Sequence, residues 1–500
     1  MKRIIALILI FITVLCVFSG CKKDARSGDE TTAPSGSVTT AGGNGGGEGG
    51  ETEDPQKTLT LPDGLNFSTD GVAKQINILQ RTNTKDEMYY EKPTGDLIGD
   101  TIYERNKDIE QKLGVKLSFH DVQGTNTTYG TYKAAITAAA ASGEETYHII
   151  ANYAYFGASL AVEGVYYDLN ELNPAKENYL AFNKLWWNQN YQKEATINGK
   201  LFFLEGDVTI SAINRLEVLF YNMNMAKSLF PDADFLEMVY SREFTYEYFL
   251  QCIVALGNGE QEGVWGCTMP RNSTSIDGFV AALDVDIVQR NTRNIPEISF
   301  NTDRTISIAR ALRTLYQENQ SVLGIEDSGR TVNEFINGKS LFHINMMSYA
   351  GNEKFRNLSF EFAIMPLPIW NENQENYKIT AHDEYSTLSV PLCVLSTDAV
   401  SAVMEYMGYL SYNNLRPVLY EKCYKARYLA TLPKAKMFDY IIDNSFFDFG
   451  YIYSNAIGNP VHILRDNIRY PDKNQLLTDV QSGASVSAVK LKDFIAKLYE

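Results

Sequence analysis

The strongest constraint on the fold of this 500-residue chain is a regular alternation of strand-like and helix-like segments early in the sequence. Short apolar runs rich in β-branched residues predict strands, and apolar residues repeated every three or four positions predict helices. The order is strand, helix, strand, helix, strand, over 74–79, 101–113, 115–120, 131–142 and 148–151. Strands separated by helices in this way form a mainly parallel sheet through right-handed crossovers. The sequence therefore predicts an α/β fold here.

Local signals mark the ends of the two predicted helices. Thr101 and Glu104 have the spacing of a capping box, which predicts that the first helix begins at Thr101. Gly114 and Gly143 follow the two helices, and glycine is favoured there because it adopts left-handed backbone angles without strain. We expect both helices to end at these glycines.

The carboxyl ends of the predicted strands are where a ligand would bind, because open α/β sheets hold ligands in the crevice outside this edge. The segments that follow the strands are 80–83, Asp121 and 152–156. Arg81 and Asn83 can hydrogen-bond to hydroxyl groups, and Tyr153 and Tyr155 offer aromatic faces. The alternatives are a solvated turn for the first pair and a packed aromatic cluster for the second.

The first 21 residues have the order of an export signal. Two basic residues precede an apolar run at 4–18, and a Ser-Gly-Cys sequence ends at Cys21. The run is shorter than the roughly 20 residues that span a bilayer, so we expect a cleaved signal peptide at 1–20. Residues 18–21 resemble the lipobox of bacterial lipoproteins, which implies a lipid on Cys21. The alternative is an ordinary signal peptide with an incidental cysteine.

The segment from 22 to about 57 contains almost no apolar residues and includes a glycine-rich run at 42–50. Such a composition cannot bury enough surface to offset its ordering entropy. We expect 21–57 to be a lipidated cysteine and a disordered tether, with an r.m.s. reach of roughly 30–35 Å. A tether of this length would hold a folded body clear of the membrane.

Size and composition narrow the function of the remaining chain. A single hydrophobic core rarely serves more than about 250–300 residues, so the body is long enough for two lobes with separate cores. A formal net charge of −16 argues against nucleic acid as a partner. No histidine has a metal-ligand spacing, and the P-loop-like sequence at 338–340 has Asn333 where the first glycine is required. We therefore expect no metal, nucleotide or other cofactor.

Four cysteines lie in the body, at Cys252, Cys267, Cys393 and Cys423, without a CxxC pair. Buried free thiols are one interpretation. A disulfide between Cys252 and Cys267 is the other, because an exported protein meets oxidising conditions.

Short motifs occur in a fixed order along the body. They include GDTIYERN at 99–106 with LGV at 113–115, NGKLFF at 198–203, FTYEYF at 244–249 and FINGKSLF at 335–342. Further motifs lie at 164–169, 219–222, 365–368 and 448–453. The ordered set covers about residues 70–500 and resembles extracellular solute-binding proteins of sugar-type ABC transporters. The chain is most similar to the clostridial lipoproteins of this family, but 425–428 lacks the acidic residue that usually accompanies the basic one, here Arg427.

The resemblance implies a two-lobed periplasmic-binding-protein type II fold. Each lobe would be a mainly parallel sheet flanked by helices, with a hinge between the lobes and the ligand in the cleft. Lobe one would take roughly 70–210 and 332–393, and lobe two roughly 211–331 and 394–500. Hinge closure of this kind is favoured only as far as the closed form binds the ligand better.

The resemblance also adds residues to the predicted site. Tyr153 and Tyr155 stand where sugar-binding relatives often have an aromatic platform, and Tyr349 lies beyond another strand of that kind. Asp207 and Asn214 lie near the first lobe crossing. Packing, hinge or surface roles are the alternatives.

Glu384 lies before the return crossing and is the preferred acidic contact, with a hinge or surface role as its alternative. Trp186 and Trp187 would point about 100° apart on a helix, so at most one of them would face a cleft. Core packing is the better interpretation for that pair.

Together these features predict a lipid-anchored receptor on the outer face of the cell membrane. It would capture an oligosaccharide or similar polar solute as a monomer, deliver it to ABC permease subunits and perform no chemistry. A secreted polysaccharide hydrolase and a ligand sensor of the same fold are the alternatives. The carboxylates of Asp383 and Glu384 could not flank one glycosidic bond, because adjacent strand residues project to opposite faces.

Overall fold

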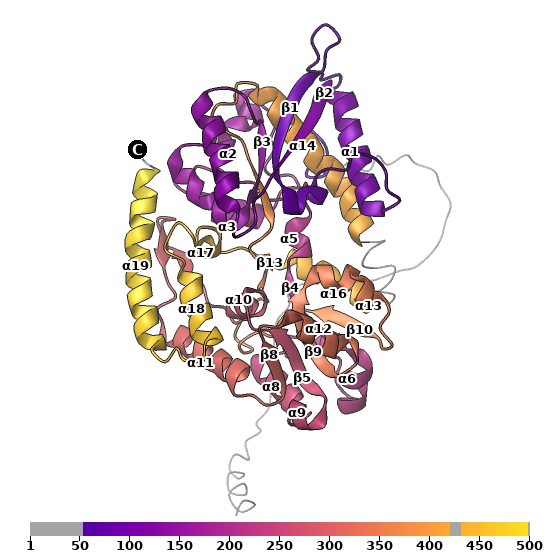
Figure 1. Cartoon of the computed structure of the whole chain (residues 1–500), viewed down its shortest axis with the longest axis vertical. Helices are drawn as coiled ribbons and strands as arrows, with labels where there is room; N and C mark the ends of the chain where they lie inside the picture. The colour runs from indigo at the N-terminus through magenta and orange to yellow at the C-terminus, as the bar shows by residue number, and fades with distance from the viewer. Residues whose placement is uncertain (1–53, 421–431, 499–500) are drawn as a thin grey trace, which may run out of the picture. The chain divides into compact units, whose positions relative to one another are not determined.

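The computed structural model describes residues 54–420 and 432–498. Cys21, Cys423, most of the expected tether and the segment 425–428 lie outside these residues. The described elements form two main sheets, each covered by helices (Figure 1). No helix in the described ranges combines the length and the apolar character that crossing a bilayer requires.

The first sheet has the strand order β12–β3–β1–β2. Its strands are β1 (Lys74–Arg81), β2 (Val115–Val122), β3 (Ile149–Tyr153) and β12 (Ser386–Ser389). β1 pairs in parallel with both β2 and β3, and β12 adds an antiparallel edge strand beside β3. The predicted mainly parallel sheet is confirmed, and the chain returns to it from a distant part of the sequence.

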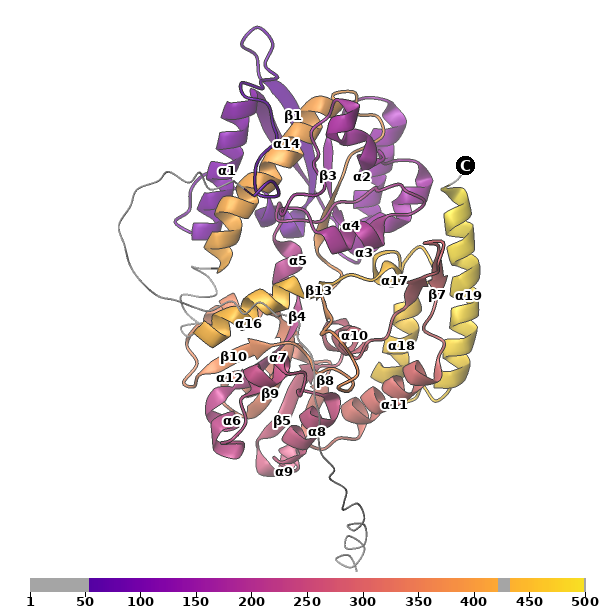
Figure 2. The ribbon, with the colours of Figure 1, turned by 180° about the vertical axis from the view of Figure 1, so that it is seen from behind.

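Helices cover the first sheet. They are α1 (Leu97–Leu113), α2 (Tyr129–Ser142), α3 (Ala154–Gly157), α4 (Gln189–Ala195) and α14 (Thr397–Leu410), with 3-10 turns η1 (Thr82–Glu87), η2 (Ala158–Glu163), η3 (Leu169–Leu172) and η4 (Pro174–Lys176). α1 and α14 lie side by side, as Figures 1 and 2 both show. The first two helices end where the sequence predicts, because Gly114 and Gly143 take left-handed φ angles of 61° and 69°.

The start of α1 corrects the sequence prediction. Asp96 caps the helix by accepting a hydrogen bond from the Gly99 amide at 2.8 Å. The Thr101 hydroxyl donates instead to the Leu97 carbonyl, within the helix, at 2.7 Å. The capping box was the wrong signal here because an aspartate one turn earlier caps as well as a threonine and lengthens the helix.

The second sheet has the order β10–β4–β9–β5–β8. Its strands are β4 (Glu217–Asn222), β5 (Trp265–Pro270), β8 (Val322–Ile325), β9 (Ser340–Met346) and β10 (Phe362–Met365). β5 pairs in parallel with β8 and β9, whereas β4 pairs antiparallel with β9 and β10. This sheet is therefore evenly mixed, because the chain enters the lobe along β4 in the opposite direction to β9.

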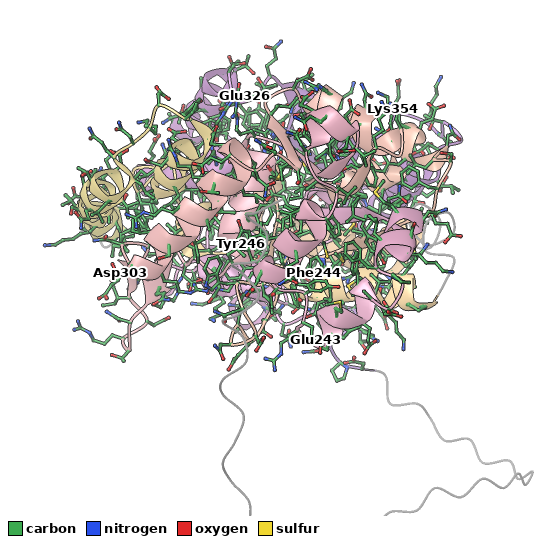
Figure 3. The ribbon with its side chains drawn as sticks, turned by 90° about the horizontal axis from the view of Figure 1, so that it is seen from below. Glu243, Phe244, Tyr246, Asp303, Glu326 and Lys354 are labelled. Carbon is green, nitrogen blue, oxygen red and sulfur yellow. The ribbon has the colours of Figure 1, made fainter. Side chains whose placement is uncertain are left out.

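The helices around the second sheet are α6 (Met223–Leu229), α7 (Phe235–Tyr240), α8 (Tyr246–Val254), α9 (Gly259–Glu262), α10 (Ser273–Ala282), α11 (Asp303–Gln317), α12 (Ser328–Ile336), α13 (Glu353–Arg356) and α16 (Leu432–Asp443). Thr245 caps α8 by accepting from the Tyr248 amide at 3.2 Å. Its neighbours Phe244 and Tyr246 appear in Figure 3. Tyr246 stacks on Trp370, so part of the predicted FTYEYF motif serves packing.

The C-terminal part of the chain contacts both lobes. It contains α17 (Phe449–Ile452), α18 (Pro460–Arg469) and α19 (Leu476–Lys497). α17 contacts α3 and α4 on one side and α18 on the other, while α18 packs on α10 and α11. Two small sheets, β6 (Val288–Arg290) with β7 (Pro296–Ile298) and β11 (Ile379–Thr380) with β13 (Ser445–Phe446), complete the fold.

The chain passes between the lobes through short segments. It leaves the first sheet through α5 (Ser211–Asn214), which precedes β4, and the segment 381–385 leads back to β12. The lobe ranges themselves stay a prediction, but sheet membership differs from them. β9 and β10 pair in the second sheet, and α14 packs on α1, because strand pairing rather than linear position decides where a segment lies.

The expected tether is shorter than predicted at its C-terminal end. The Lys184 ammonium donates to the carbonyls of Pro55 at 2.8 Å and Thr58 at 2.7 Å, and the Leu185 amide donates to the Gln56 carbonyl at 3.2 Å. Lys184 is almost fully buried, so these carbonyls satisfy a charge that would otherwise lack partners. Residues 54–57 therefore belong to the body.

Candidate functional site

The larger of two cavities at the lobe boundary has a volume of about 390 Å³. This volume lies within the roughly 300–1,000 Å³ of ligand pockets. The wall combines first-lobe residues, the α5 connection, Arg416 and the segment around β13. The lining residues are Leu185, Trp186, Asn188, Gln189, Asn190, Glu205, Gly206, Asp207, Ala212, Ile213, Leu216, Arg416, Ile442, Asp443, Ser445 and Phe447.

A backbone pairing builds one wall of this cavity. The Asp207 amide donates to the Trp186 carbonyl and the Asn188 amide donates to the Glu205 carbonyl, both at 3.0 Å. A Cβ at Gly206 would lie 2.2 Å from the Trp186 carbonyl oxygen, so only glycine allows the two segments to approach this closely. The pairing places one amide and two carboxylates along the same wall.

Of the two carboxylates that this pairing places in the cavity wall, Asp207 is paired with a positive charge. Arg416 follows the π-helical turn η6 (Ser411–Leu415), and its Nη1 lies 3.4 Å from the Asp207 carboxylate. Burial raises the pKa of Asp207 to about 6, even though Arg416 opposes the shift. Burial, with the charge of Asp207 added, raises the pKa of Glu205 to about 8. Glu205 is therefore mainly protonated at neutral pH and can both donate to and accept from a hydroxyl group.

Both adjacent tryptophans are core residues, which is the interpretation that the sequence favours. Trp186 borders the larger cavity, but its side chain is fully buried and its ring packs on Tyr409 of α14. Trp187 is buried and donates its indole N–H to Glu405 at 2.9 Å. The larger cavity thus combines the Phe447 ring and aliphatic side chains with planar polar groups.

Four of the predicted site residues meet at the carboxyl end of β1. Arg81 donates to the Glu384 carbonyl at 2.9 Å, and its guanidinium lies 4.6 Å from the centre of the Tyr153 ring. Asn83 donates to the Glu384 carboxylate at 3.2 Å, and Arg215 lies 3.5 Å from the same carboxylate. Arg81 is fully buried and Tyr153 nearly so, so in this conformation both act as packing between β1 and the return crossing.

Tyr155 joins the two lobes. Its hydroxyl donates to the Asn459 side chain at 2.9 Å, and its ring stacks on His462 with centroids 5.7 Å apart. Burial raises the pKa of Tyr155 to about 12, so the hydroxyl keeps its proton and its donor role. The aromatic position predicted after the third strand therefore lies at the lobe boundary.

The remaining predicted residues differ in their placement. Asp207 lines the larger cavity. Asn214 ends α5, between cavity-lining Ile213 and Leu216. Tyr349 lies in η5 (Met347–Gly351), with its ring 5.9 Å from that of Phe355, and lines neither of the two boundary cavities.

Sequence reasoning missed Glu205, Arg416 and Phe447. The Glu-Gly-Asp sequence at 205–207 was the available signal, because a glycine between two acidic residues permits close backbone approach. Arg416 and Phe447 carried no comparable local signal. They join the cavity from parts of the chain about two hundred residues away from Asp207.

The smaller cavity adjoins the larger one, since Phe447 lines both. Its volume is about 20 Å³, and Leu216 lines the larger cavity while the next residue, Glu217, lines the smaller. We call it the acidic cavity, because four carboxylates lie in its wall, those of Glu217, Asp277, Asp383 and Asp448. The other lining residues are Ala154, Tyr155, Thr380, Ala381, His382, Tyr385, Phe447, Tyr451 and Ile452.

Two other sequence questions concern cysteine and metal chemistry. Cys252 and Cys267 are buried free thiols, so the interpretation without a disulfide holds. Burial raises the pKa of Cys252 to about 12, which keeps it an unreactive thiol. Within residues 54–420 and 432–498, no group of three or more histidine, cysteine or carboxylate side chains could hold a metal ion.

The two lobes, their connections and the boundary cavities define the two-lobed fold of sugar-type ABC substrate-binding proteins. An ABC substrate-binding protein of Listeria monocytogenes in complex with cycloalternan is 12% identical, with a TM-score of 0.53 over 83% of this chain and 97% of that one. The GacH receptor of Streptomyces glaucescens, solved unliganded and with acarbose, is 14% identical, with a TM-score of 0.54 over 84% and 99%.

A solute-binding protein of an ABC transporter from Thermotoga lettingae, bound to α-D-tagatose, is 12% identical, with a TM-score of 0.55 over 84% of this chain and 100% of that one. No protein-family model and no curated protein sequence matches the chain. The likeness to the solved structures establishes the fold.

Proposed function

We propose that this protein captures a carbohydrate or similar polar solute between its lobes and delivers it to an ABC permease. The observation that carries the proposal is the chemistry of the larger cavity. A sugar presents an apolar C–H face and many hydroxyl groups, so it needs ring surface beside planar hydrogen-bonding groups. Phe447 offers ring surface and Leu185 and Ile213 add apolar surface, while Asn188, Glu205 and Asp207 offer the polar groups.

The fold supports the same proposal. Solved proteins with this fold include receptors in complex with cycloalternan, acarbose and tagatose, which are all carbohydrates. Short connections at α5 and 381–385 would let the lobes move as rigid bodies, and a ligand would favour closure by binding the closed form better. Closure would also remove the ligand from water and create a surface that a permease can recognise.

The protein would work outside the cell, anchored by a lipid on Cys21. The motif at 18–21 and the polar segment that follows it support this part of the proposal. Expression with radiolabelled palmitate should label the protein, and Cys21→Ala should abolish the label. Equal labelling of the variant would contradict the anchor.

We prefer solute binding without catalysis to the alternative function, polysaccharide hydrolysis. The pKa of Glu205 is raised, as in a general acid, but solved proteins of this fold include binding proteins with intact sugars bound. Incubation with maltodextrin and chitin fragments should release no reducing sugar. Turnover that disappears in Glu205→Gln would instead favour a hydrolase.

A thermal-shift screen tests solute capture. The panel contains mono- and oligosaccharides, peptides and polyamines, and a ligand at 100 times its Kd should add about 2.7 kcal/mol of stability. Asp207→Asn should weaken the response to the best carbohydrate roughly tenfold, because a charged hydrogen-bond partner is worth about 1.5 kcal/mol or more.

Asp303→Asn is the matched control, since Asp303 is exposed at the start of α11, as Figure 3 shows. It should respond to carbohydrate as the unmodified protein does. A panel in which only peptides raise the melting temperature would overturn the carbohydrate assignment.

Transport and sensing differ in the partner protein that recognises the ligand-bound, closed conformation. Liposomes containing a candidate permease should bind the loaded protein and take up the solute. Recruitment of a sensor kinase without uptake would favour the sensing alternative.

A further inference from the structure

Glu217 is a buried carboxylate that has no hydrogen-bond partner among the residues the structure describes. It is 1% exposed, and neither of its side-chain oxygens has a hydrogen-bond partner in the described part of the chain. A buried carboxylate of this kind is costly unless a proton or a cation accompanies it. Its position in the wall of the acidic cavity shows where a cation could reach it.

Two of the neighbouring acidic groups of this cavity, Asp277 and Asp448, already have their own hydrogen-bond partners. Arg465 forms a two-point ion pair with Asp277, with Nε 2.9 Å from Oδ1 and Nη2 on the second oxygen. Asp448 caps α17 through the Gly450 amide. Asp383 lies 3.6 Å from the Nδ1 atom of His382, beyond hydrogen-bond distance, but its side chain is partly exposed to solvent. Glu217 is thus the fully buried carboxylate of this group that has no hydrogen-bond partner among the described residues, and it is left for an incoming charge.

The size of the acidic cavity limits what can enter it. A volume of about 20 Å³ exceeds the roughly 10–15 Å³ that one water molecule needs, and it excludes a sugar ring. An ammonium group is close to water in size and brings three donors, which suits carboxylate oxygens. Tyr155, Tyr385 and Tyr451 add aromatic rings, which attract cations.

We propose that the captured solute carries an ammonium group, which enters the acidic cavity and pairs with Glu217. This inference rests on the proposed function, because the rest of the solute would occupy the larger cavity. The two cavities share Phe447, and the consecutive residues Leu216 and Glu217 face one cavity each. A ring in the larger cavity could therefore extend an amino substituent into the acidic one, as an amino sugar would.

The neighbouring backbone shapes this arrangement. A Cβ at Gly278 would lie 2.4 Å from the Glu217 carboxylate oxygen, so the glycine of α10 makes the room in which this side chain sits. A larger residue at 278 would displace the carboxylate. The space that holds Glu217 thus depends on both β4 and α10.

Binding of the ammonium group should release a proton. Burial, with the charges of Asp277 and Asp383 added, raises the pKa of Glu217 well above its usual value, which favours its protonated form when no cation is bound. The protonated carboxyl would give up its proton as the ammonium ion replaces it. The charged or titratable groups that line this cavity or act on Glu217 are Tyr155, Asp277, His382, Asp383, Tyr385, Asp448, Tyr451 and Arg465.

Calorimetry on the full chain tests the inference with three probes. Chitosan oligosaccharides carry amino groups, their N-acetylated counterparts have the same backbone without charge, and spermidine is cationic without a sugar. At mildly acidic pH the chitosan oligosaccharide should bind at least about tenfold tighter than its acetylated counterpart, a difference of about 1.4 kcal/mol. Titrations in buffers of different ionisation enthalpy should reveal proton release.

Glu217→Gln should remove both the preference and the proton release. Asp383→Asn, at a partly exposed position, should reduce the preference without threatening folding. Glu260→Gln is the control, because its exposed ion pair with Arg330 lies outside the acidic cavity. The control should keep the preference.

The possible outcomes separate this inference from the proposed function. Equal binding of charged and neutral oligosaccharides, or a preference that survives Glu217→Gln, overturns the inference and leaves carbohydrate capture standing. Binding of spermidine alone, lost in Glu217→Gln, supports the cation site and overturns the carbohydrate assignment. Failure of every cationic probe overturns the inference.

Discussion

The larger cavity and the acidic cavity share a wall but treat their carboxylates differently. In the larger cavity Asp207 faces Arg416, and Glu205 lies beside Asn188 and Asp207. In the acidic cavity Glu217 faces negative neighbours and has no hydrogen-bond partner in the described chain. The comparison shows that partners decide what a buried carboxylate can do. A partnered one can bind neutral hydroxyls, whereas an unpartnered one favours a cation.

The largest loss of stability should come from breaking the ion pair between Asp277 and Arg465 at the acidic cavity. Asp277→Ala leaves Arg465 buried without its carboxylate, and breaking a buried pair in this way costs about 3–5 kcal/mol. Urea denaturation measures the loss. The exposed pair offers a control, because Glu260→Ala should cost less than about 1 kcal/mol. Equal losses of stability in the two variants would show that the ion pair at the acidic cavity contributes no more than an exposed one.

The next effect is a dependence of stability on pH that comes from Glu205 in the larger cavity. The folded protein holds a proton on Glu205 up to a pKa of about 8, above the ordinary value of 4.5. Between these values the folded state binds more protons than the unfolded state, so this group's stabilisation is complete below 4.5 and is lost as pH rises towards 8. Glu205→Gln should raise the free energy of unfolding at pH 8 by about 4 kcal/mol.

Urea titrations across this pH range give the measurement. The variant should show a flatter dependence of stability on pH than the unmodified protein. Glu243→Gln, at an exposed position shown in Figure 3, should leave the dependence unchanged. Parallel curves for Glu205→Gln and the unmodified protein would contradict the raised pKa.

A smaller effect should follow Gly278→Ala. The added methyl group overlaps the Glu217 carboxylate, and such overpacking costs about 1–3 kcal/mol. Stability should fall by about 2 kcal/mol, and the preference for the chitosan oligosaccharide should fall with it. Binding of the neutral oligosaccharide in the larger cavity should persist. Loss of both activities together would show that the two cavities do not act separately.

The smallest effect should follow Tyr155→Phe, which removes the hydroxyl that donates to Asn459 and lies 3.4 Å from Nε2 of His462. The loss of the bond to Asn459 should cost about 1 kcal/mol, measured by thermal unfolding. The stacking on His462 should remain, because the ring is unchanged. A loss of several kcal/mol would mean that this hydroxyl supports more of the lobe boundary than one bond.

Part of the site could be predicted because strand ends meet by a general rule. Arg81 and Tyr153 are the last residues of two neighbouring strands of one sheet, and the structure places the guanidinium against the ring. Glu384 joins them from the return crossing, as its position before β12 suggested. The rule located these residues but not their exposure, so it could not reveal that Arg81 is fully buried.

The sequence by itself determined the local elements: the α/β alternation, the glycines that end α1 and α2, and the polar segments after the strands. These depend on residues within one or two turns of each other, so short-range patterns suffice. Only the tertiary structure decided that β9 and β10 join the second sheet and that Asp207 meets Arg416. Only it decided that Glu217 has no hydrogen-bond partner within 54–420 and 432–498, because burial and pairing there depend on segments far apart in the chain.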